Sequence, residues 1–222
     1  MITLKNTTKS YEINKNNKIT ALEDINLHIK EGEVVVLKGK SGSGKSTILS
    51  LIAALTKPTS GEIIVNEKRV SKLPDSFASD YRQEDIGFIF QKYNLIPTLS
   101  VKDNILLPLV PTNPDEKEAQ TKLDKVMKQF NITHKKETMV RNLSGGEQQR
   151  VAIARAHVND PKIIIADEPT ANLDESLSLD FIEILKSLKE EGKTIVIATH
   201  DPLFFDLEVV DRVIEIKAGK IV

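Results

Sequence analysis

The eight residues 39–46, with the sequence GKSGSGKS, constrain the fold of this chain more than any other segment. A continuous apolar run of strand length, 34–37, comes shortly before them, and an apolar stretch with helical spacing, 48–55, follows. A glycine-rich loop between a buried strand and a helix is a recurring unit of α/β proteins with a mostly parallel sheet. The sequence therefore predicts an α/β fold built around this unit.

Two more continuous apolar runs, 163–166 and 194–198, have the length of strands that are buried on both faces. The residues between them, from about 175 to 191, have the apolar spacing of a helix. A strand, a helix and a second buried strand predict parallel pairing through a right-handed crossover. By contrast, 2–10 and 22–29 alternate apolar and polar residues, which predicts antiparallel strands with one buried face.

The middle of the chain differs from the rest, because its apolar residues mostly have helical spacing and prolines interrupt the pattern. We expect a single domain over 1–222, in which 1–91 and 161–222 form the α/β core with an N-terminal antiparallel β subdomain. Residues from about 92 to 160 are predicted to form an inserted helical subdomain. Its predicted helices are 101–107, 115–130 and 144–157.

Residues 39–46 match the spacing G-x-x-x-x-G-K-[ST] of a phosphate-binding loop, which predicts a P-loop NTPase core. The glycines let backbone N–H groups turn toward phosphate oxygens, and the start of the following helix also favours an anion. We expect Lys45 to act on the β- and γ-phosphates of a nucleotide and the Ser46 hydroxyl to be a Mg²⁺ ligand. The alternative is a solvated Gly/Ser-rich turn, which would not require this strand and helix. The predicted nucleotide contacts are Gly39, Ser41, Gly42, Ser43, Gly44, Lys45, Ser46 and Thr47.

Two adjacent carboxylates, Asp167 and Glu168, follow the predicted strand 163–166. This is the end of a strand where α/β sheets place their ligands. Asp167 is suited to hold Mg²⁺, and Glu168 to orient or deprotonate the water that attacks the γ-phosphate. The pair could also simply end a strand before Pro169, but a phosphate-binding loop in the same chain favours the functional interpretation.

The sequence LSGGEQQR at 143–150 predicts the start of a helix. Ser144 and Glu147 have the spacing of a capping box, which is a sufficient local explanation for both residues. A cap does not require Gly145 and Gly146, however, and glycines at a helix start expose backbone N–H groups to an anion. A second phosphate-type site in one chain suggests that it serves the nucleotide of another molecule.

Together, the phosphate-binding loop, the segment LSGGEQQR and the later sequence IIIADEPT resemble the ATPases of ABC (ATP-binding cassette) transporters. The resemblance covers essentially the whole chain. It implies that two such domains dimerise head to tail, with ATP and Mg²⁺ held between the phosphate-binding loop of one and the LSGGE segment of the other. It also implies ATP hydrolysis, with Lys45, Glu168 and His200 as catalytic residues.

The resemblance assigns further residues by their order along the chain. Gln91 matches a glutamine that contacts Mg²⁺ and communicates with a membrane partner, and His200 matches a histidine that contacts the γ-phosphate. Asp174 ends ANLD, which matches a loop that communicates across the dimer, and Tyr11 matches an aromatic residue that stacks on adenine. The implied ATP contacts therefore include Tyr11, Gln91, Ser144, Gly145, Gly146, Glu147 and Asp174, and the implied metal ligands are Ser46, Gln91 and Asp167.

Composition limits the partners of the chain. Its formal net charge is -1, which does not indicate binding to nucleic acid, and it has no cysteine for a disulfide or a thiolate metal site. No apolar run approaches the roughly 20 residues of a transmembrane helix. We expect a cytoplasmic protein that reaches the inner face of the membrane through an integral membrane, permease-type subunit, and that pairs with a second ATPase subunit, an identical chain in the simplest case.

The segments VKDNILLPL at 101–109 and ADEPTANLD at 166–174 resemble the lipoprotein-release and macrolide-export subgroup, which also includes the cell-division ATPase FtsE. A transporter or mechanotransmission subunit and a regulatory cell-division ATPase both remain open. A soluble ABC ATPase for DNA repair or translation is disfavoured, because such proteins generally carry a coiled-coil insert or two cassettes.

Overall fold

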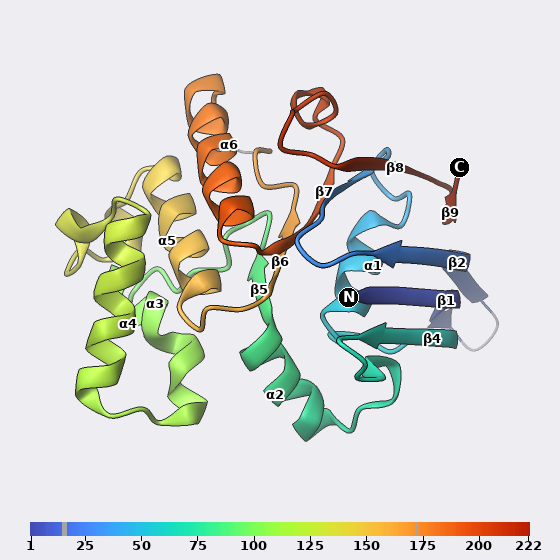
Figure 1. Ribbon diagram of the computed structural model, residues 1–222, viewed down its shortest axis with the longest axis horizontal. Helices are drawn as coiled ribbons and strands as arrows, with labels where there is room; N and C mark the ends of the chain where they lie inside the picture. Colours follow the sequence, from blue (N-terminus) through green and yellow to red (C-terminus); the bar gives the residue numbers. More distant parts are fainter. Residues whose placement is uncertain (15–16, 172) are drawn as a thin grey trace.

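The computed structural model describes residues 1–14, 17–171 and 173–222, and its strands form two sheets (Figure 1). The smaller sheet has the order β2-β1-β4, and both of its pairings are antiparallel. Buried apolar and exposed side chains alternate from Ile25 to Ile29 of β2, which agrees with the predicted single buried face. The strands of this sheet are β1 (Ile2–Asn14), β2 (Asn17–Ile29) and β4 (Ser60–Val65).

The larger sheet has six strands in the order β5-β6-β7-β3-β8-β9, all parallel except for the last pairing. Its central strands are continuous β-branched and apolar runs, as expected for strands that are covered on both faces. The strands are β3 (Val34–Lys38), β5 (Ile86–Ile89), β6 (Ile163–Asp167), β7 (Thr194–Thr199), β8 (Arg212–Lys217) and β9 (Lys220–Ile221).

Helices surround the larger sheet, and those from the middle of the chain gather on the side away from the three-stranded sheet (Figure 1). The α-helices are α1 (Lys45–Ile52), α2 (Asp75–Asp85), α3 (Val101–Leu106), α4 (Glu116–Gln129), α5 (Gly145–His157) and α6 (Glu175–Glu190). Short 3₁₀ turns are η1 (Val70–Lys72), η2 (Leu107–Thr112), η3 (Thr133–Lys135), η4 (Val140–Asn142) and η5 (Pro202–Phe204).

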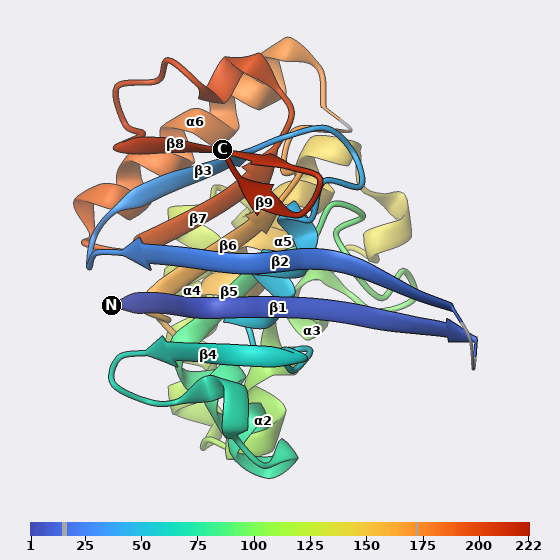
Figure 2. The same cartoon turned by 90° about the vertical axis from the view of Figure 1, so that its right-hand side faces the viewer.

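Successive residues of the central strands belong to two different hydrophobic cores. Val34 and Val36 of β3 pack into the core shared with α3, α4, α5 and α6, whereas Val35 and Leu37 pack into the core shared with α1 and the three-stranded sheet. Figure 2 shows the three-stranded sheet lying in front of the larger sheet. This double burial explains why the central strands have no polar face.

The strand order brings together four loops that are distant in sequence. β5, β6, β7 and β3 are neighbours, so their carboxyl ends lie at one edge of the sheet. The glycine-rich loop follows β3, the acidic pair lies at the end of β6, and Gln91 and His200 follow β5 and β7. This edge is the usual ligand position in an open α/β sheet.

The structure confirms the predicted strands and helices but corrects several of their limits. β1 and β2 are longer than the predicted 2–10 and 22–29, and α1 ends at Ile52 instead of continuing to residue 55. The sequence patterns did not predict β4, α2, β8 and β9. The limits at about 92 and 160 of a separate helical subdomain stay a prediction, although α3, α4 and α5 do fall between them.

Candidate functional site

The glycine-rich loop ends in a helix start that has no side-chain cap. Gly44 is the N-cap of α1, with φ of 111°, and no acidic residue lies in the first turn. A Cβ atom at Gly44 would lie 2.6 Å from Leu22 and 2.8 Å from the carbonyl oxygen of Ala21, so both the backbone angle and the close approach require glycine. The orphan N–H groups of α1 are therefore available to an anion.

Lys45 lies inside this loop, with its side chain only 5% exposed. Its ammonium donates to the carbonyl oxygen of Gly39 at 2.7 Å and to that of Lys40 at 3.4 Å. The same Nζ lies 3.3 Å from Oε1 of Glu168, which forms an ion pair across the cavity. The predicted phosphate-binding cation and the predicted catalytic carboxylate thus neutralise each other.

Ser46 and Asp167 also meet, although they are distant in the sequence. The Ser46 hydroxyl donates to Oδ1 of Asp167 at 2.9 Å. Burial raises the pKa of the Asp167 carboxyl, and the hydrogen bond from Ser46 opposes that rise. Ser46 and Gln91 line one cavity, and Asp167 lies directly behind it through its bond with Ser46. A hydroxyl, an amide oxygen and a carboxylate are ligand types that suit Mg²⁺. The described part of the chain contains no cluster of three or more His, Cys, Asp or Glu side chains able to hold a metal, so the remaining ligands would have to come from nucleotide and water.

Glu168 is held by contacts with β7 and with the residue that follows this strand. Its backbone has φ of 45°, an uncommon angle for a non-glycine residue, and its N–H donates to the carbonyl oxygen of Ala198 at 2.8 Å. Oε2 accepts from the Thr199 hydroxyl and lies close to Nδ1 of His200, both at 3.0 Å. Burial acts to raise the pKa of Glu168, but the hydrogen bonds from His200 and Thr199 and the charge of Lys45 outweigh it and lower the pKa overall. The carboxylate is therefore ionised at neutral pH and can accept a proton.

These groups line one cavity of about 360 Å³ at the carboxyl edge of the larger sheet. It contains most of the residues predicted around the phosphates, together with Ala21 of β2, which no sequence pattern indicated. Gly39 instead lines an adjoining cavity of about 350 Å³ beside β8. The lining residues of the first cavity are Ala21, Ser41, Gly42, Ser43, Gly44, Lys45, Ser46, Thr47, Gln91, Glu168 and His200.

Tyr11 is not among the residues that line either cavity. It lies on β1 opposite Ile19 of β2, and its side chain is 42% exposed. The Lys9 ammonium lies 4.8 Å from the centre of its ring. The ring is thus accessible for stacking, and the proposed contact with adenine stays a prediction.

The segment at the start of α5 forms the predicted capping box. The Ser144 side chain accepts from the Glu147 N–H, and the Glu147 carboxylate accepts from the Ser144 N–H at 2.8 Å and from its hydroxyl at 2.9 Å. Glu147 also pairs with Lys135 at 3.0 Å. The backbone bond from Ser144 and the bond from Lys135 lower the pKa of Glu147 to about 2. The Ser144 N–H and hydroxyl therefore already have an intramolecular acceptor, which a phosphate would have to replace.

The two glycines that follow differ in their surroundings. Gly145 is exposed, and a Cβ atom there would have no neighbour within 4 Å in the described part of the chain. Gly146 is buried, and a Cβ atom there would lie 2.5 Å from Cδ2 of Leu177 in α6. Packing within the chain therefore accounts for Gly146 but not for Gly145.

Asp174 lies near the residues at the start of α5. It is the N-cap of α6, and its Oδ1 accepts from the Leu177 N–H at 2.9 Å. Since Leu177 faces Gly146, Asp174 neighbours the start of α5. Asn172, in the middle of the predicted loop 171–174, lies outside the described residues.

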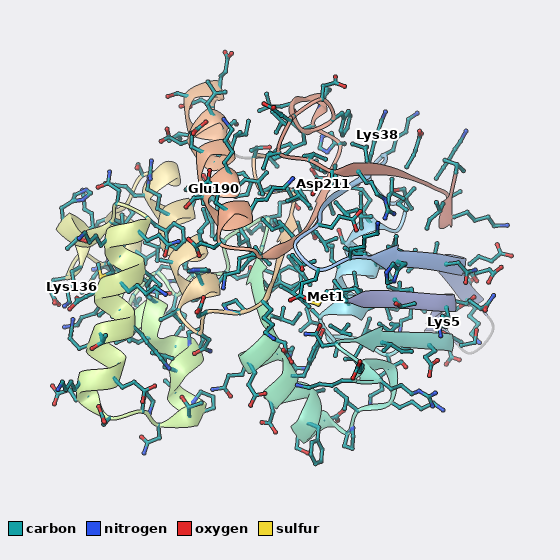
Figure 3. The ribbon with its side chains drawn as sticks, in the orientation of Figure 1. Met1, Lys5, Lys38, Lys136, Glu190 and Asp211 are labelled. Atoms are coloured by element: carbon teal, nitrogen blue, oxygen red, sulfur yellow. The ribbon has the colours of Figure 1, made fainter. Side chains whose placement is uncertain are left out.

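The start of α5 is well separated from the phosphate-type cavity. The two helix starts lie on opposite sides of α6 and β7 in Figure 1, and no residue of 144–147 lines the cavity. Figure 3 places Lys38, which comes directly before the glycine-rich loop, far from Lys136, which follows the residue that pairs with Glu147. One chain therefore cannot bring both groups of residues to one phosphate in this conformation.

Comparisons with known proteins agree with this geometry. Residues 22–171 match the sequence profile of the ABC transporter family. The ABC transporter ATP-binding protein MJ0796 of Methanocaldococcus jannaschii, a protein whose function is described as uncharacterized, is 43% identical over 206 residues, which cover 90% of this chain and 87% of that protein. The similarly described YknY of Bacillus subtilis is 40% identical over 222 residues, which cover all of this chain and 95% of that protein.

The macrolide export ATP-binding/permease protein MacB of Campylobacter jejuni is 42% identical over 221 residues. The match covers all of this chain but 33% of MacB, so the chain spans about one third of the length of that relative. Among solved structures, a dimer of MJ0796 in a post-hydrolysis state with ADP and Pi has a TM-score of 0.91 and 40% identity, covering 100% of this chain and 96% of that one.

Proposed function

The chain belongs to the ABC transporter ATPase family, in the subgroup of MacB, LolD and FtsE, and from that premise we propose that it is the ATP-hydrolysing subunit of a membrane complex. ATP binding closes a head-to-tail dimer, and hydrolysis reopens it. The observation that carries the proposal is the division of the predicted phosphate-binding groups between two separated places on one chain.

At the cavity beside α1, the loop around Lys45 supplies positive charge and backbone N–H groups to the β- and γ-phosphates. Glu168 orients and deprotonates the attacking water, and His200 contacts the γ-phosphate. Ser46, Gln91 and Asp167 would hold Mg²⁺, which when bound neutralises charge on the phosphates. Without nucleotide these side chains satisfy one another, as the contacts of Glu168 with Lys45 and His200 show, so entering ATP exchanges internal partners for phosphate oxygens.

At the other location, the start of α5, a second molecule would meet Ser144, Gly145 and Gly146. Two copies arranged head to tail would each complete the cavity of the other. Hydrolysis by positioning and charge neutralisation would then depend on closure. The solved structure of MJ0796 in a post-hydrolysis state is a dimer bound to ADP and Pi, which supports an ATP-enclosing dimer for this chain.

A membrane subunit is the proposed partner. In the part of the chain that the structure describes, no helix is long and apolar enough to cross a bilayer. MacB is named for both an ATP-binding and a permease part, and this chain matches one third of it. We infer that an integral membrane, permease-type partner anchors the dimer at the cytoplasmic face of the membrane. A regulatory role of the cell-division type, which signals through a membrane partner without transport, is the alternative.

Glu168→Gln tests the enzymatic part of this proposal. We expect turnover to fall by about 10²- to 10⁴-fold, the range for losing a general base. ATP binding should persist, and MgATP should convert the variant into a dimer that light scattering detects. Glu190→Gln, an exposed glutamate at the end of α6, is the matched control and should behave as wild type. Near-normal turnover of Glu168→Gln would refute the assignment.

The partner can be identified by purifying tagged Glu168→Gln protein with MgATP from detergent-solubilised native membranes, followed by mass spectrometry. A partner with few transmembrane helices and a large external domain supports a mechanical transporter, and co-purification of division proteins supports the regulatory alternative. A permease with many spans contradicts a mechanical transporter, and the absence of any membrane protein contradicts the proposed partner. Both outcomes leave the ATPase assignment intact.

A further inference from the structure

The Glu168 carboxylate is fixed by three side chains, one from the start of α1 and two from consecutive residues at the end of β7. Lys45 of α1 meets Oε1, whereas Thr199 and His200 both meet Oε2. The proposed reaction gives Lys45 and His200 other tasks, because both act on phosphate oxygens. Thr199 is the remaining side chain with no task of its own.

Thr199 occupies a rigid position. It is the last residue of β7 and is fully buried. Its hydroxyl donates to Oε2 of Glu168 at 3.0 Å and accepts from the backbone N–H of Asp201, also at 3.0 Å. The bond from Asp201 fills an acceptor position of the hydroxyl, which favours the orientation that directs its hydrogen at the carboxylate.

The Asp201 end of this chain of hydrogen bonds is also fixed. Oδ2 of Asp201 accepts from the Thr170 hydroxyl at 2.8 Å, and Oδ1 accepts from the Leu203 N–H at 3.0 Å. The backbone of Glu168 is bound to the same strand through Ala198. Carboxylate and hydroxyl are therefore held by adjacent paired strands, the arrangement that gives a site its geometric precision.

We propose that Thr199 is a positioning residue for ATP hydrolysis, which keeps the Glu168 carboxylate directed at the attacking water after phosphate has drawn Lys45 and His200 away. The inference rests on the proposed function, in which Glu168 acts on water. The backbone N–H of His200, 3.3 Å from Oε2, adds a weaker contact from the same turn. Binding of ATP itself does not involve Thr199, because the hydroxyl acts only through Glu168.

The test is the ATPase activity of Thr199→Val and Thr199→Ser. Valine keeps the shape but removes the hydroxyl, so we expect kcat to fall about tenfold to thirtyfold, with the KM for ATP within about twofold of wild type. Serine keeps the hydroxyl and should restore most of kcat. ATP-dependent dimerisation should be normal in both variants.

Thr194→Val is the matched control, because Thr194 begins the same strand, is equally buried and accepts a hydrogen bond from the Gly32 N–H. It should leave kcat unchanged, and thermal melts of all three variants establish that they fold. Normal kcat in Thr199→Val, or equal losses in Thr194→Val and Thr199→Val, overturns the proposal. If Glu168→Gln itself keeps turnover, the proposed role of Glu168 is wrong, and the positioning role of Thr199 is wrong with it. If Glu168→Gln is inactive while Thr199→Val is normal, only the positioning role fails.

Discussion

The chain contains two glycine-flanked helix starts of phosphate-binding type, at α1 and α5, and they are built in opposite ways. The α1 start has no side-chain cap and no acid in its first turn, and a buried lysine lies beside it. The α5 start is capped by its own serine and carries Glu147 in its first turn. Helix starts favour anions through the same N–H groups and dipole in both cases, so the side chains make the difference.

The contrast predicts that α1 determines the affinity of one chain for ATP, whereas α5 acts only in the assembled dimer. The α1 start supplies a cation and can bind phosphate within one chain. The α5 start has its own carboxylate as anion, so it is suited to a phosphate whose charge other groups already neutralise. We therefore expect substitutions at α1 to change ATP binding by the isolated chain, and substitutions at α5 to leave that binding unchanged.

Ser144→Arg should have the largest effect on turnover. If turnover did not fall, the proposed difference between α1 and α5 would be wrong. Arginine at the exposed start of α5 would obstruct a facing nucleotide, so we expect turnover to fall about a hundredfold or more, as for loss of a transition-state donor. ATP binding by the monomer, measured by fluorescence or calorimetry, should be unchanged. Loss of monomer binding would mean that α5 belongs to the cavity of its own chain.

Lys45→Met is the converse change at α1. Charge-assisted hydrogen bonds contribute about 1.5–3 kcal/mol, so ATP affinity of the monomer should fall about tenfold to a hundredfold. Lys40→Met, an exposed lysine of the same loop whose ammonium has no assigned role, is the control for charge alone. Equal effects of the two substitutions on affinity would show that Lys45 contributes only general charge.

Gly145→Ala changes the start of α5 by a single methyl group, so its expected effect is smaller and easier to assign. A methyl group there meets no atom in the described part of the chain, so stability and monomer binding should not change. We expect turnover to fall about tenfold, because the methyl group displaces a facing nucleotide. Gly146→Ala is the comparison variant, since its methyl group meets Leu177 and should lower the melting temperature. Wild-type turnover in Gly145→Ala would contradict a facing molecule at this position.

Glu147→Gln should have the smallest effect. The pKa of Glu147 is lowered to about 2, so the stabilisation by its charge is complete above the ordinary carboxyl pKa and is lost as pH falls from about 4.5 toward 2. We expect the substitution to lower stability by about 0.5–1 kcal/mol at pH 7, measured by thermal unfolding. The difference between variant and wild type should narrow at pH 4. A difference that widens at low pH would contradict the role of the charge.

Sequence patterns predicted the parallel core and the residues of its phosphate-type cavity, because continuous apolar strands and short motifs are local signals. They missed α2, whose sequence is polar and which buries only Ala78 and Tyr81, and β4, whose first residues are exposed. They also missed Ala21 and Thr199. Thr199 reaches Glu168 only through the pairing of β6 with β7, and such a contact between distant residues leaves no local pattern.

The ion pair of Lys45 with Glu168 was not predicted either. Each residue was assigned to ATP or water from its motif, but without nucleotide the two charges neutralise each other inside the cavity. A motif identifies what a residue can bind, whereas the partner that it has before nucleotide enters depends on the assembled strands.

The most direct test of the divided site is to mix Lys45→Met, which is defective at α1, with Ser144→Arg, which is defective at α5, and to measure ATP hydrolysis at an ATP concentration at which each variant alone has little turnover. In a head-to-tail dimer each mixed pair contains one intact site, made by α1 of one chain and α5 of the other. We predict that equal amounts recover up to about one quarter of the wild-type rate, since half of the dimers are mixed and each has one intact site. If mixed dimers form, as cross-linking can establish, but turnover stays at the level of the separate variants, both helix starts serve the same chain and the divided site is wrong.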